Sequence, residues 1–361
     1  MDREFRRKFV EYANTLPLKE RRLPILRRDP PTAMYSDLIE MVEHQLILSD
    51  QERRLVLPNL KAFSNSSLGV FSDYSGEGSG SYFVYSVLVC GFNMRAGFDL
   101  LMKDARERHR LGEKEIAFKD FRMGQMRRAL PDFLHAADQL PGFLCTVAVD
   151  KAIVSVLGAH DRENKEKMIG LLEQAGLGRR KAAVAEKIGR VTHLTAYLIA
   201  LLGSTGQNIF WMTDHDEICG PSDQHELLLR LLFERVLPIY VRRGVEFDKM
   251  GGAIPFPEKS VEMNDLLSIP DVAAGTLGDY LSKWDVQRPD EIRVKEGAEK
   301  VLLWLGRDGV GLKKVCFILR MGNAGVLERG EVRMSPTQKE EMISSRSFSE
   351  WPGGTVGKRS G

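Results

Sequence analysis

The sequence predicts a layered α/β fold with a mixed β-sheet. An apolar run at residues 68–73 and a second at 80–91 are separated by a glycine-rich loop, the pattern of an antiparallel hairpin. Later apolar runs at 143–150 and 208–213 are separated by helical stretches, as in sheets whose strands are joined by helices. A hairpin followed by helix-connected strands predicts antiparallel and parallel pairs within one sheet.

Length and composition bound the class of protein. With 361 residues and 43% hydrophobic content, the chain can bury a full core, as one large domain with additions or as two domains. Its 52 basic and 50 acidic residues give a net charge of +2, which excludes a strongly basic nucleic-acid coat but leaves a local basic groove open. No segment reaches the roughly 18 apolar residues that a membrane helix requires, so no membrane association is expected.

The cysteines and the N-terminus indicate the compartment. The four cysteines are far apart and lie in mostly apolar runs, with no spacing typical of a zinc site or a redox motif. We interpret them as reduced core thiols, and the first residues lack the apolar segment of a secretion signal. A cytoplasmic protein is therefore expected.

Two additions are predicted around a core domain that spans residues 66–284. Residues 1–65 are rich in arginine and broken by prolines, and they predict a helical N-terminal extension that includes an amphipathic helix at 37–48. Residues 285–335 predict a small α+β addition, with a helix over 291–305 and a strand pair over 313–334. The polar segment 336–361 has too little apolar content to pack, which predicts a disordered tail.

The core elements after the hairpin alternate between helix and strand. In chain order, the sequence predicts a helix over 118–140, a strand over 143–150, a polar insertion with its own helical pattern over 161–181, a helix over 183–202, a strand over 208–213, a helix over 222–236, a short strand over 238–241, a segment around Ile254, and a helix over 269–281.

Acidic residues recur where these elements begin or end. Asp73 follows the first apolar strand, and Asp150 and the segment 214–216 follow later ones. Asp271 comes after a proline at the predicted start of the last helix. Converging carboxylates repel one another and require a cation, and hard oxygen ligands favour Mg²⁺ or Mn²⁺. Two such ions held roughly 3.5–4 Å apart activate water for phosphodiester hydrolysis, so the pattern predicts nuclease chemistry.

Each acid also has a simpler interpretation. Asp73 with its glycines suits a hairpin turn, and Asp271 suits the dipole of a helix start. Glu115 lies in a charged stretch, and Asp150 at a strand end, where either can be solvated. Strand alternation favours Asp214 over Asp216 as the inward acid. A dinucleotide fingerprint, a phosphate loop, a zinc-protease helix and a nucleophile elbow are all absent from the sequence.

Several of these segments together resemble a known family. Asp73-Tyr74-Ser75-Gly76 is similar to the Asp-Glu-Ser-Gly signature of the domain-of-unknown-function 3800 family, which is grouped with RNase H-like proteins. There the motif also ends a first strand and precedes a Tyr-Phe-Val-type second strand. Segments 115–119, 147–151 and 267–275 resemble further elements of the family. The resemblance covers roughly residues 68–282 and leaves both additions unexplained.

The resemblance implies an RNase H-like sheet that carries a metal-dependent nuclease or phosphodiesterase. Its implied acids are Asp73, Glu115, Asp150 or the 214–216 cluster, and Asp271. We expect Asp73 to bridge the metal ions, Asp150, Asp214 and Asp271 to complete their shells, and Lys119 or Lys151 to neutralise phosphate. The substrate is nucleic acid, either DNA or RNA. The family is chiefly bacterial, and a role in defence against mobile DNA is an association only.

One departure from the family motif keeps a second interpretation open. The family's usual Glu after the first Asp is Tyr74 here, and Glu77 on the same loop is a candidate replacement. The alternative is a catalytically inactive RNase H-like module that binds nucleic acid or a partner, and the sequence leaves a homo-oligomer or a protein partner open. Basic pairs that would then guide a polyanion occur at 6–8, 21–22, 27–28, 127–128, 179–181 and 242–243.

Overall fold

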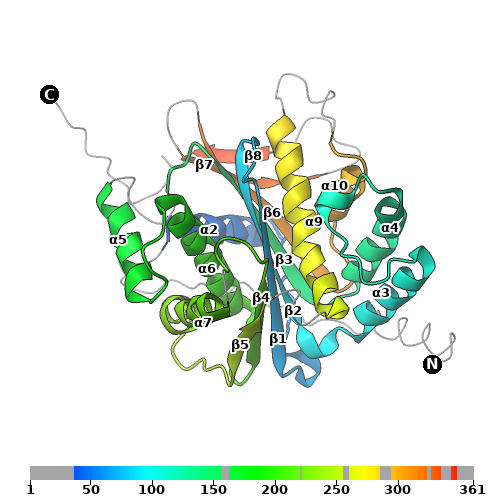
Figure 1. The fold of residues 1–361 in the computed structure, drawn as a ribbon, viewed down its shortest axis with the longest axis horizontal. Helices are drawn as coiled ribbons and strands as arrows, with labels where there is room; N and C mark the ends of the chain where they lie inside the picture. The colour runs from blue at the N-terminus through cyan, green and yellow to red at the C-terminus, as the bar shows by residue number, and fades with distance from the viewer. Residues whose placement is uncertain are drawn as a thin grey trace.

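The computed structural model describes residues 36–155, 162–219, 222–254, 260–284, 294–322, 327–334 and 343–347. The strands of these residues form one sheet in the order β5-β4-β1-β2-β3-β6-β7-β8 (Figure 1). In chain order they are β1 (Ser67–Ser75), β2 (Tyr82–Gly91), β3 (Gly142–Asp150), β4 (Asn208–Thr213), β5 (Met250–Ala253), β6 (Leu312–Met321), β7 (Leu327–Val332) and β8 (Ile343–Ser347).

The sheet is mixed, as the sequence predicts. β2 runs antiparallel to both β1 and β3. β4 is parallel to β1, β5 is parallel to β4, and β6 is parallel to β3. β7 and β8 close one edge as antiparallel strands. The predicted α/β class, a mixed sheet flanked by helices, is confirmed, because the first hairpin stays antiparallel and the helix-connected strands pair in parallel. The RNase H-like assignment stays a prediction.

Helices cover both faces of the sheet (Figure 1). One face packs against α2, α6, η4 and α8, and the other packs against α3, α4, α9 and α10. The described helices are α2 (Asp37–Gln51), η1 (Ala62–Ser64), η2 (Phe92–Met94), α3 (Ala96–His109), η3 (Phe118–Asp120), α4 (Gly124–Asp138), α5 (Arg162–Gln174), α6 (Ala182–Leu202), α7 (Ser222–Arg230), η4 (Leu231–Val236), α8 (Leu237–Tyr240), α9 (Val261–Lys283) and α10 (Ala298–Leu305).

The two faces of β1 feed two separate apolar cores. Val70 points into the core beneath α6, whereas its neighbour Phe71 points into the core beneath α9. Both side chains are fully buried, which explains why the central strands are apolar runs rather than alternating patterns. Alternate residues of β1 therefore pack against different helical layers.

Two sequence predictions about elements are wrong, and one helix was not predicted. The predicted strand at 238–241 is a helix, α8, which continues the π-helical η4. The last core helix starts at Val261 rather than near 269, and Pro270 lies inside it, although a proline usually ends a helix. The α3 helix was not expected, because its charged residues obscure a short apolar face. Burial in a protein core overrides each of these local signals.

The C-terminal addition is continuous with the core sheet. β6 pairs with β3 along eight residue pairs, and α10 packs with α9 and α4. Part of the predicted tail, Ile343–Ser347, forms the edge strand β8, while the rest of 336–361 lies outside the described residues. The described residues within 285–335 therefore extend the same sheet.

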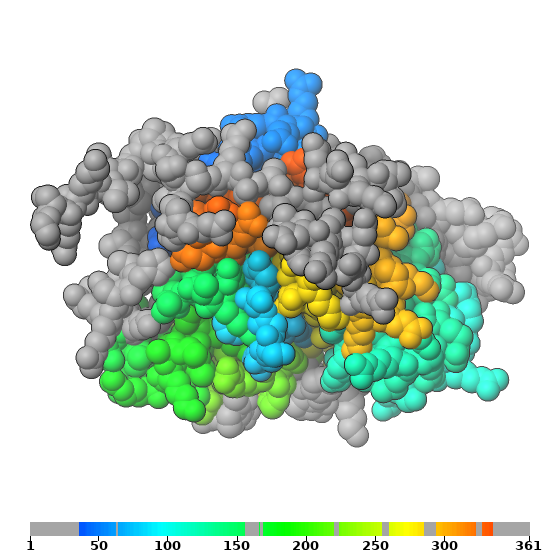
Figure 2. All heavy atoms as spheres, turned by 90° about the horizontal axis from the view of Figure 1, so that it is seen from above, coloured from blue at the N-terminus to red at the C-terminus, as the bar shows by residue number. Residues whose placement is uncertain are grey.

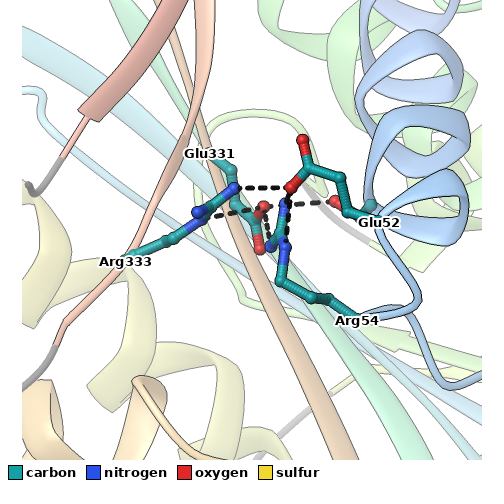
Figure 3. Close-up of polar contacts among 5 residues, drawn as sticks. Glu52, Arg54, Glu331 and Arg333 are labelled. Atoms are coloured by element: carbon teal, nitrogen blue, oxygen red, sulfur yellow. Dashed lines mark hydrogen bonds and ion pairs between the residues drawn. The ribbon is translucent and has the colours of Figure 1, made fainter.

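The N-terminal addition contacts this extended sheet. Residues 1–35 lie outside the described part of the chain, but α2 and the residues after it are described. Arg54 forms ion pairs with Glu52 and with Glu331 of β7, and Arg333 also bonds both acids (Figure 3). Four alternating charges thus join the segment after α2 to β7.

The cysteines and the helices can be compared with the expectations from the sequence. All four cysteines are buried and free, as expected for core thiols. Within the part of the chain that the structure describes, no helix is both long and apolar enough to cross a membrane.

Candidate active site

Asp73 lies inside a paired strand. We expected it to open the loop after the first strand, but β1 continues to Ser75 and Asp73 is in register with Ser86 of β2. Strand alternation places its side chain on the Phe71 face, which α9 covers, and only 6% of the residue is exposed. The strand pairing therefore holds this carboxylate rigidly in a nearly dry position.

The hairpin after Asp73 has a fixed shape. Gly76 adopts φ +109°, and a Cβ there would lie 2.1 Å from the carbonyl oxygen of Tyr82, so only glycine fits. Lys151 Nζ donates to the carbonyl oxygen of Gly78 over 2.6 Å. Figure 2 looks onto this end of the molecule and shows the light-blue hairpin between green atoms and the yellow atoms of α9. Both flanking layers reach the hairpin.

Asp271 comes from the middle of α9 instead of a helix start. Its Oδ2 accepts a hydrogen bond from the backbone N–H of Phe118 over 2.6 Å. The interpretation of Asp271 as a helix-dipole acid does not apply, because ten residues of α9 precede it. Burial raises the pKa of Asp271 to about 7, against the lowering effect of the Phe118 amide.

Glu115 and Asp214 complete the group. Asp214 follows β4, and its backbone N–H donates to the Ser72 carbonyl, which sets it beside β1. Glu115 precedes η3 and forms a 3.6 Å ion pair with Lys119, whose side chain is 75% exposed. The pKa of each acid is raised, mainly by burial and further by neighbouring carboxylates.

Asp73 is the electrostatic centre of this group. Burial raises its pKa well above the usual aspartate range, and the charges of Asp271, Asp214 and Glu115 raise it further. Among the described residues, neither Asp73, Asp214 nor Asp271 forms an ion pair. We call these four residues the acid cluster: Asp73, Glu115, Asp214 and Asp271. It is a site of excess negative charge.

Asp150 and Lys151 lie outside the acid cluster. Asp150 Oδ1 accepts from the Ala152 amide over 2.8 Å, and its Oδ2 accepts from the Met321 amide over 3.4 Å. These two bonds give Asp150 a structural role at the end of β3, where it binds the backbone of the following turn and of β6. Lys151 bonds Gly78 and lies 5.0 Å from the ring centroid of Phe83, so it supports the hairpin. Lys119 is the predicted lysine that the structure brings to the cluster.

Tyr74, which replaces the family's Glu, faces the opposite side of the sheet. Its hydroxyl bonds Thr213, and its ring lies 6.2 Å from Tyr85 in the layer beneath α6. Glu77 pairs with Lys187 of α6, as does Asp216. Neither Tyr74 nor Glu77 therefore replaces or removes a carboxylate on the Asp73 face, and Asp214 rather than Asp216 belongs to the cluster.

The acid cluster fits a hard divalent cation in chemistry but not in spacing. Its donors are carboxylate oxygens, and their raised pKa values reflect burial without a paired cation. Among the residues that the structure describes, however, no three His, Cys, Asp or Glu side chains lie close enough together to hold a metal ion. A cation would have to draw these side chains closer together.

Comparison with known proteins adds no family or relative. Neither the protein-family models nor the curated proteins match this chain. The resemblance to the domain-of-unknown-function 3800 family thus stays a prediction that rests on the segments named above.

The basic pairs are partly neutralised where the structure describes them. Arg127 pairs with Glu296, and Arg179 pairs with Glu166 at 2.8 Å. Arg180 donates to Gln224 and to the Leu177 carbonyl. The predicted pairs at 6–8, 21–22 and 27–28 lie outside the described residues. Lys119 is the exposed lysine, among the described residues, that pairs with an acid of the cluster.

Sequence reasoning missed two lysines near the site. Lys187 binds Glu77 and Asp216 from α6, and Lys295 donates to the carbonyls of Phe118 and Lys119. A lone lysine in a helix or loop carries no sequence signal of its partners. Gly275, one helical turn after Asp271, is a weak signal, since an interior helix glycine often marks close packing.

Proposed function

We propose that this protein is a divalent-metal-dependent phosphodiester hydrolase acting on nucleic acid, with the acid cluster as its catalytic site. The main observation is that three acids, from the segment before η3, the end of β4 and α9, act electrostatically on Asp73 of β1, while no cation of the described residues pairs with it. Three of the four cluster acids, Asp73, Asp214 and Asp271, form no ion pair among the described residues, and buried carboxylates in that state are costly without a cation. The resemblance to the domain-of-unknown-function 3800 family supports the same reaction class.

The proposed roles follow from position. Asp73, Asp214 and Asp271 supply oxygen ligands, and Glu115 holds Lys119 beside them. A divalent cation bound there would activate water and stabilise the leaving oxygen. Lys119, exposed and next to the acids, is placed to contact a substrate phosphate. Asp150 is absent from this set because its oxygens are occupied by backbone amides.

A second candidate is a catalytically inactive module that binds nucleic acid or a partner. The observation that favours it is the spacing of the acids, since no three described acidic, His or Cys side chains are close enough to hold a metal ion. In that case Lys119 and the basic pairs matter, whereas the acids do not.

The deciding experiment compares two isosteric substitutions. Purified wild type, Asp73→Asn and Asp150→Asn are incubated with labelled single- and double-stranded DNA and RNA, in Mg²⁺, Mn²⁺ or chelator. The proposal expects metal-dependent cleavage by wild type and by Asp150→Asn, and its loss in Asp73→Asn. Absence of cleavage by wild type in every condition, with nucleic-acid binding retained in all three proteins, would establish the inactive module instead.

A further inference from the structure

The loop that carries Glu115 and Lys119 is attached to α9 by Lys295, a residue of the C-terminal addition. Lys295 Nζ donates to the carbonyl of Phe118 over 2.6 Å and to that of Lys119 over 2.8 Å. It also lies 4.5 Å from the centroid of the Phe118 ring, within the range of a cation–π contact. One ammonium group therefore binds two successive carbonyls of η3 and the ring of Phe118.

Lys295 is itself held in place by α9. Its backbone N–H donates to Asp279 Oδ2 over 2.8 Å, two helical turns beyond Asp271. The other Asp279 oxygen pairs with Lys283 at 2.7 Å. The same helix thus carries Asp271, an acid of the cluster, and Asp279, which binds the lysine that bonds η3.

Phe118 connects this arrangement to the acid cluster. The Phe118 amide donates to Asp271 Oδ2, and the Phe118 ring packs against Gly275 so closely that a Cβ there would lie 2.4 Å from the ring. The ring also meets Phe121 edge-on, with centroids 5.3 Å apart. Phe118 has its carbonyl on Lys295, its amide on Asp271 and its ring on Gly275, so it is held from three sides.

We propose that Lys295 is a positioning residue, which through Phe118 orients the Asp271 carboxylate toward Asp73 and makes the C-terminal addition a required part of the active site. This inference rests on the proposed function for its effect on activity, but its structural part does not. Groups that orient a metal ligand typically change metal affinity or activity by about tenfold to a hundredfold when they are removed. The C-terminal addition would then serve catalysis and not only the stability of the sheet edge.

The test uses Lys295→Met, which keeps the aliphatic chain and removes the donor, and Lys295→Arg, which restores a cation. Lys300→Met is the matched control, because Lys300 is an exposed lysine in the same addition. Its backbone N–H donates to the Gly297 carbonyl, a bond that the substitution does not remove. The full-length chain is used throughout. Thermal unfolding of each variant shows whether the fold is retained.

The first readout is hydrogen exchange at the Phe118 amide. Selective ¹⁵N labelling of the 17 phenylalanines, with assignment through Phe118→Leu, isolates this resonance. Exchange at Phe118 should become about tenfold faster in Lys295→Met, as for a weakened bond to a charged acceptor, with recovery in Lys295→Arg and no change in Lys300→Met. Unchanged exchange in Lys295→Met would overturn the positioning role whatever the protein catalyses.

The second readout is Mn²⁺ affinity, measured by electron paramagnetic resonance, alongside cleavage of labelled nucleic acid. We expect about tenfold weaker Mn²⁺ binding and a lower kcat at unchanged KM in Lys295→Met. If wild type neither binds Mn²⁺ nor cleaves, the proposed function fails while the exchange result still decides the link from Lys295 to Phe118. If wild type binds and cleaves and Lys295→Met matches it, the inference alone fails.

Discussion

The backbone amide of Phe118 donates a hydrogen bond to the carboxylate of Asp271 across a sequence separation of 153 residues. It joins the segment between α3 and α4 to the middle of α9, two elements with no sequence signal of contact. The bond stabilises the ionised carboxylate, whereas burial opposes ionisation and raises its pKa to about 7. At Asp271, a hydrogen-bond donor that favours the ionised carboxylate is therefore opposed by burial, which favours the protonated form.

The first prediction concerns stability against pH without a cation. The folded-state pKa of Asp271 lies above its usual value of 3.8, so the native state binds the proton more tightly. The free energy of unfolding should then fall as pH rises through about 7, by on the order of 1 kcal/mol between pH 6 and pH 8 from this group. Urea unfolding in chelator should show this slope, and Asp271→Asn should reduce it. Equal slopes in both proteins would contradict the prediction.

The second prediction concerns metal addition and removal. A cation that binds only the native state raises its stability, and binding requires ionised carboxylates. Mn²⁺ should raise the Tm of wild type more at pH 8 than at pH 6, because Asp271 must lose its proton first. Chelator should reverse the shift. Asp73→Asn should abolish the shift, whereas Asp150→Asn should keep it. A shift of equal size in Asp73→Asn would place the ion elsewhere.

The third prediction compares two glycines of α9. A Cβ at Gly275 would meet the Phe118 ring at 2.4 Å, whereas one at Gly278 would meet a Val84 methyl carbon at 3.3 Å. Gly275→Ala should lower the free energy of unfolding by about 1–3 kcal/mol, as overpacking does, and should displace Phe118 from Asp271. Gly278→Ala should be close to neutral, because the roughly 1 kcal/mol by which alanine favours a helix over glycine offsets the tight contact with Val84. Urea unfolding of both variants checks the difference.

The fourth prediction concerns Lys187, whose side chain is 11% exposed and binds Glu77 and Asp216, with Glu217 at 3.9 Å. Lys187→Met leaves these acids facing one another and should cost about 1–3 kcal/mol of stability, less than a fully buried pair because Glu77 is partly solvated.

Arg230→Met provides the matched control for Lys187→Met. Arg230 forms an exposed pair with Glu226 at 2.7 Å, with both side chains at least 60% exposed, so its loss should cost about 0.5 kcal/mol or less. Thermal and urea unfolding of the two variants give the comparison. Similar losses in both would mean that Lys187 acts as an ordinary surface charge.

The sheet followed from the sequence more fully than the helices did. The runs at 68–73, 80–91, 143–150 and 208–213 became strands because both faces of a central sheet are apolar, which makes them continuous in the sequence. The segment 238–241 is equally apolar but extends a helix, and periodicity alone cannot separate these cases over four residues. Pro270 indicated a helix boundary that packing inside α9 removed.

Part of the site was predictable for a related reason. Parallel β1 and β4 end at the same edge, so Asp73 and Asp214 had to be neighbours. Asp150 ends a strand in the same direction, but β2 separates it from β1 and its oxygens bind backbone amides. Lys295 depends on a tertiary contact that no local pattern encodes.

The ion pairs between the segment after α2 and β7 bear on how the chain can be trimmed. Arg54 and Glu331 belong to opposite ends of the described sequence, yet each neutralises the other. Deleting the C-terminal addition would leave the Arg54 charge without its Glu331 partner and uncover the edge of β3, and deleting the N-terminal addition would leave Glu331 without Arg54 and uncover the surface that α2 covers. A stable minimal fragment must therefore keep α2 with the segment after it as well as β6 and β7, and protease cuts between these elements and the core should release no autonomous piece.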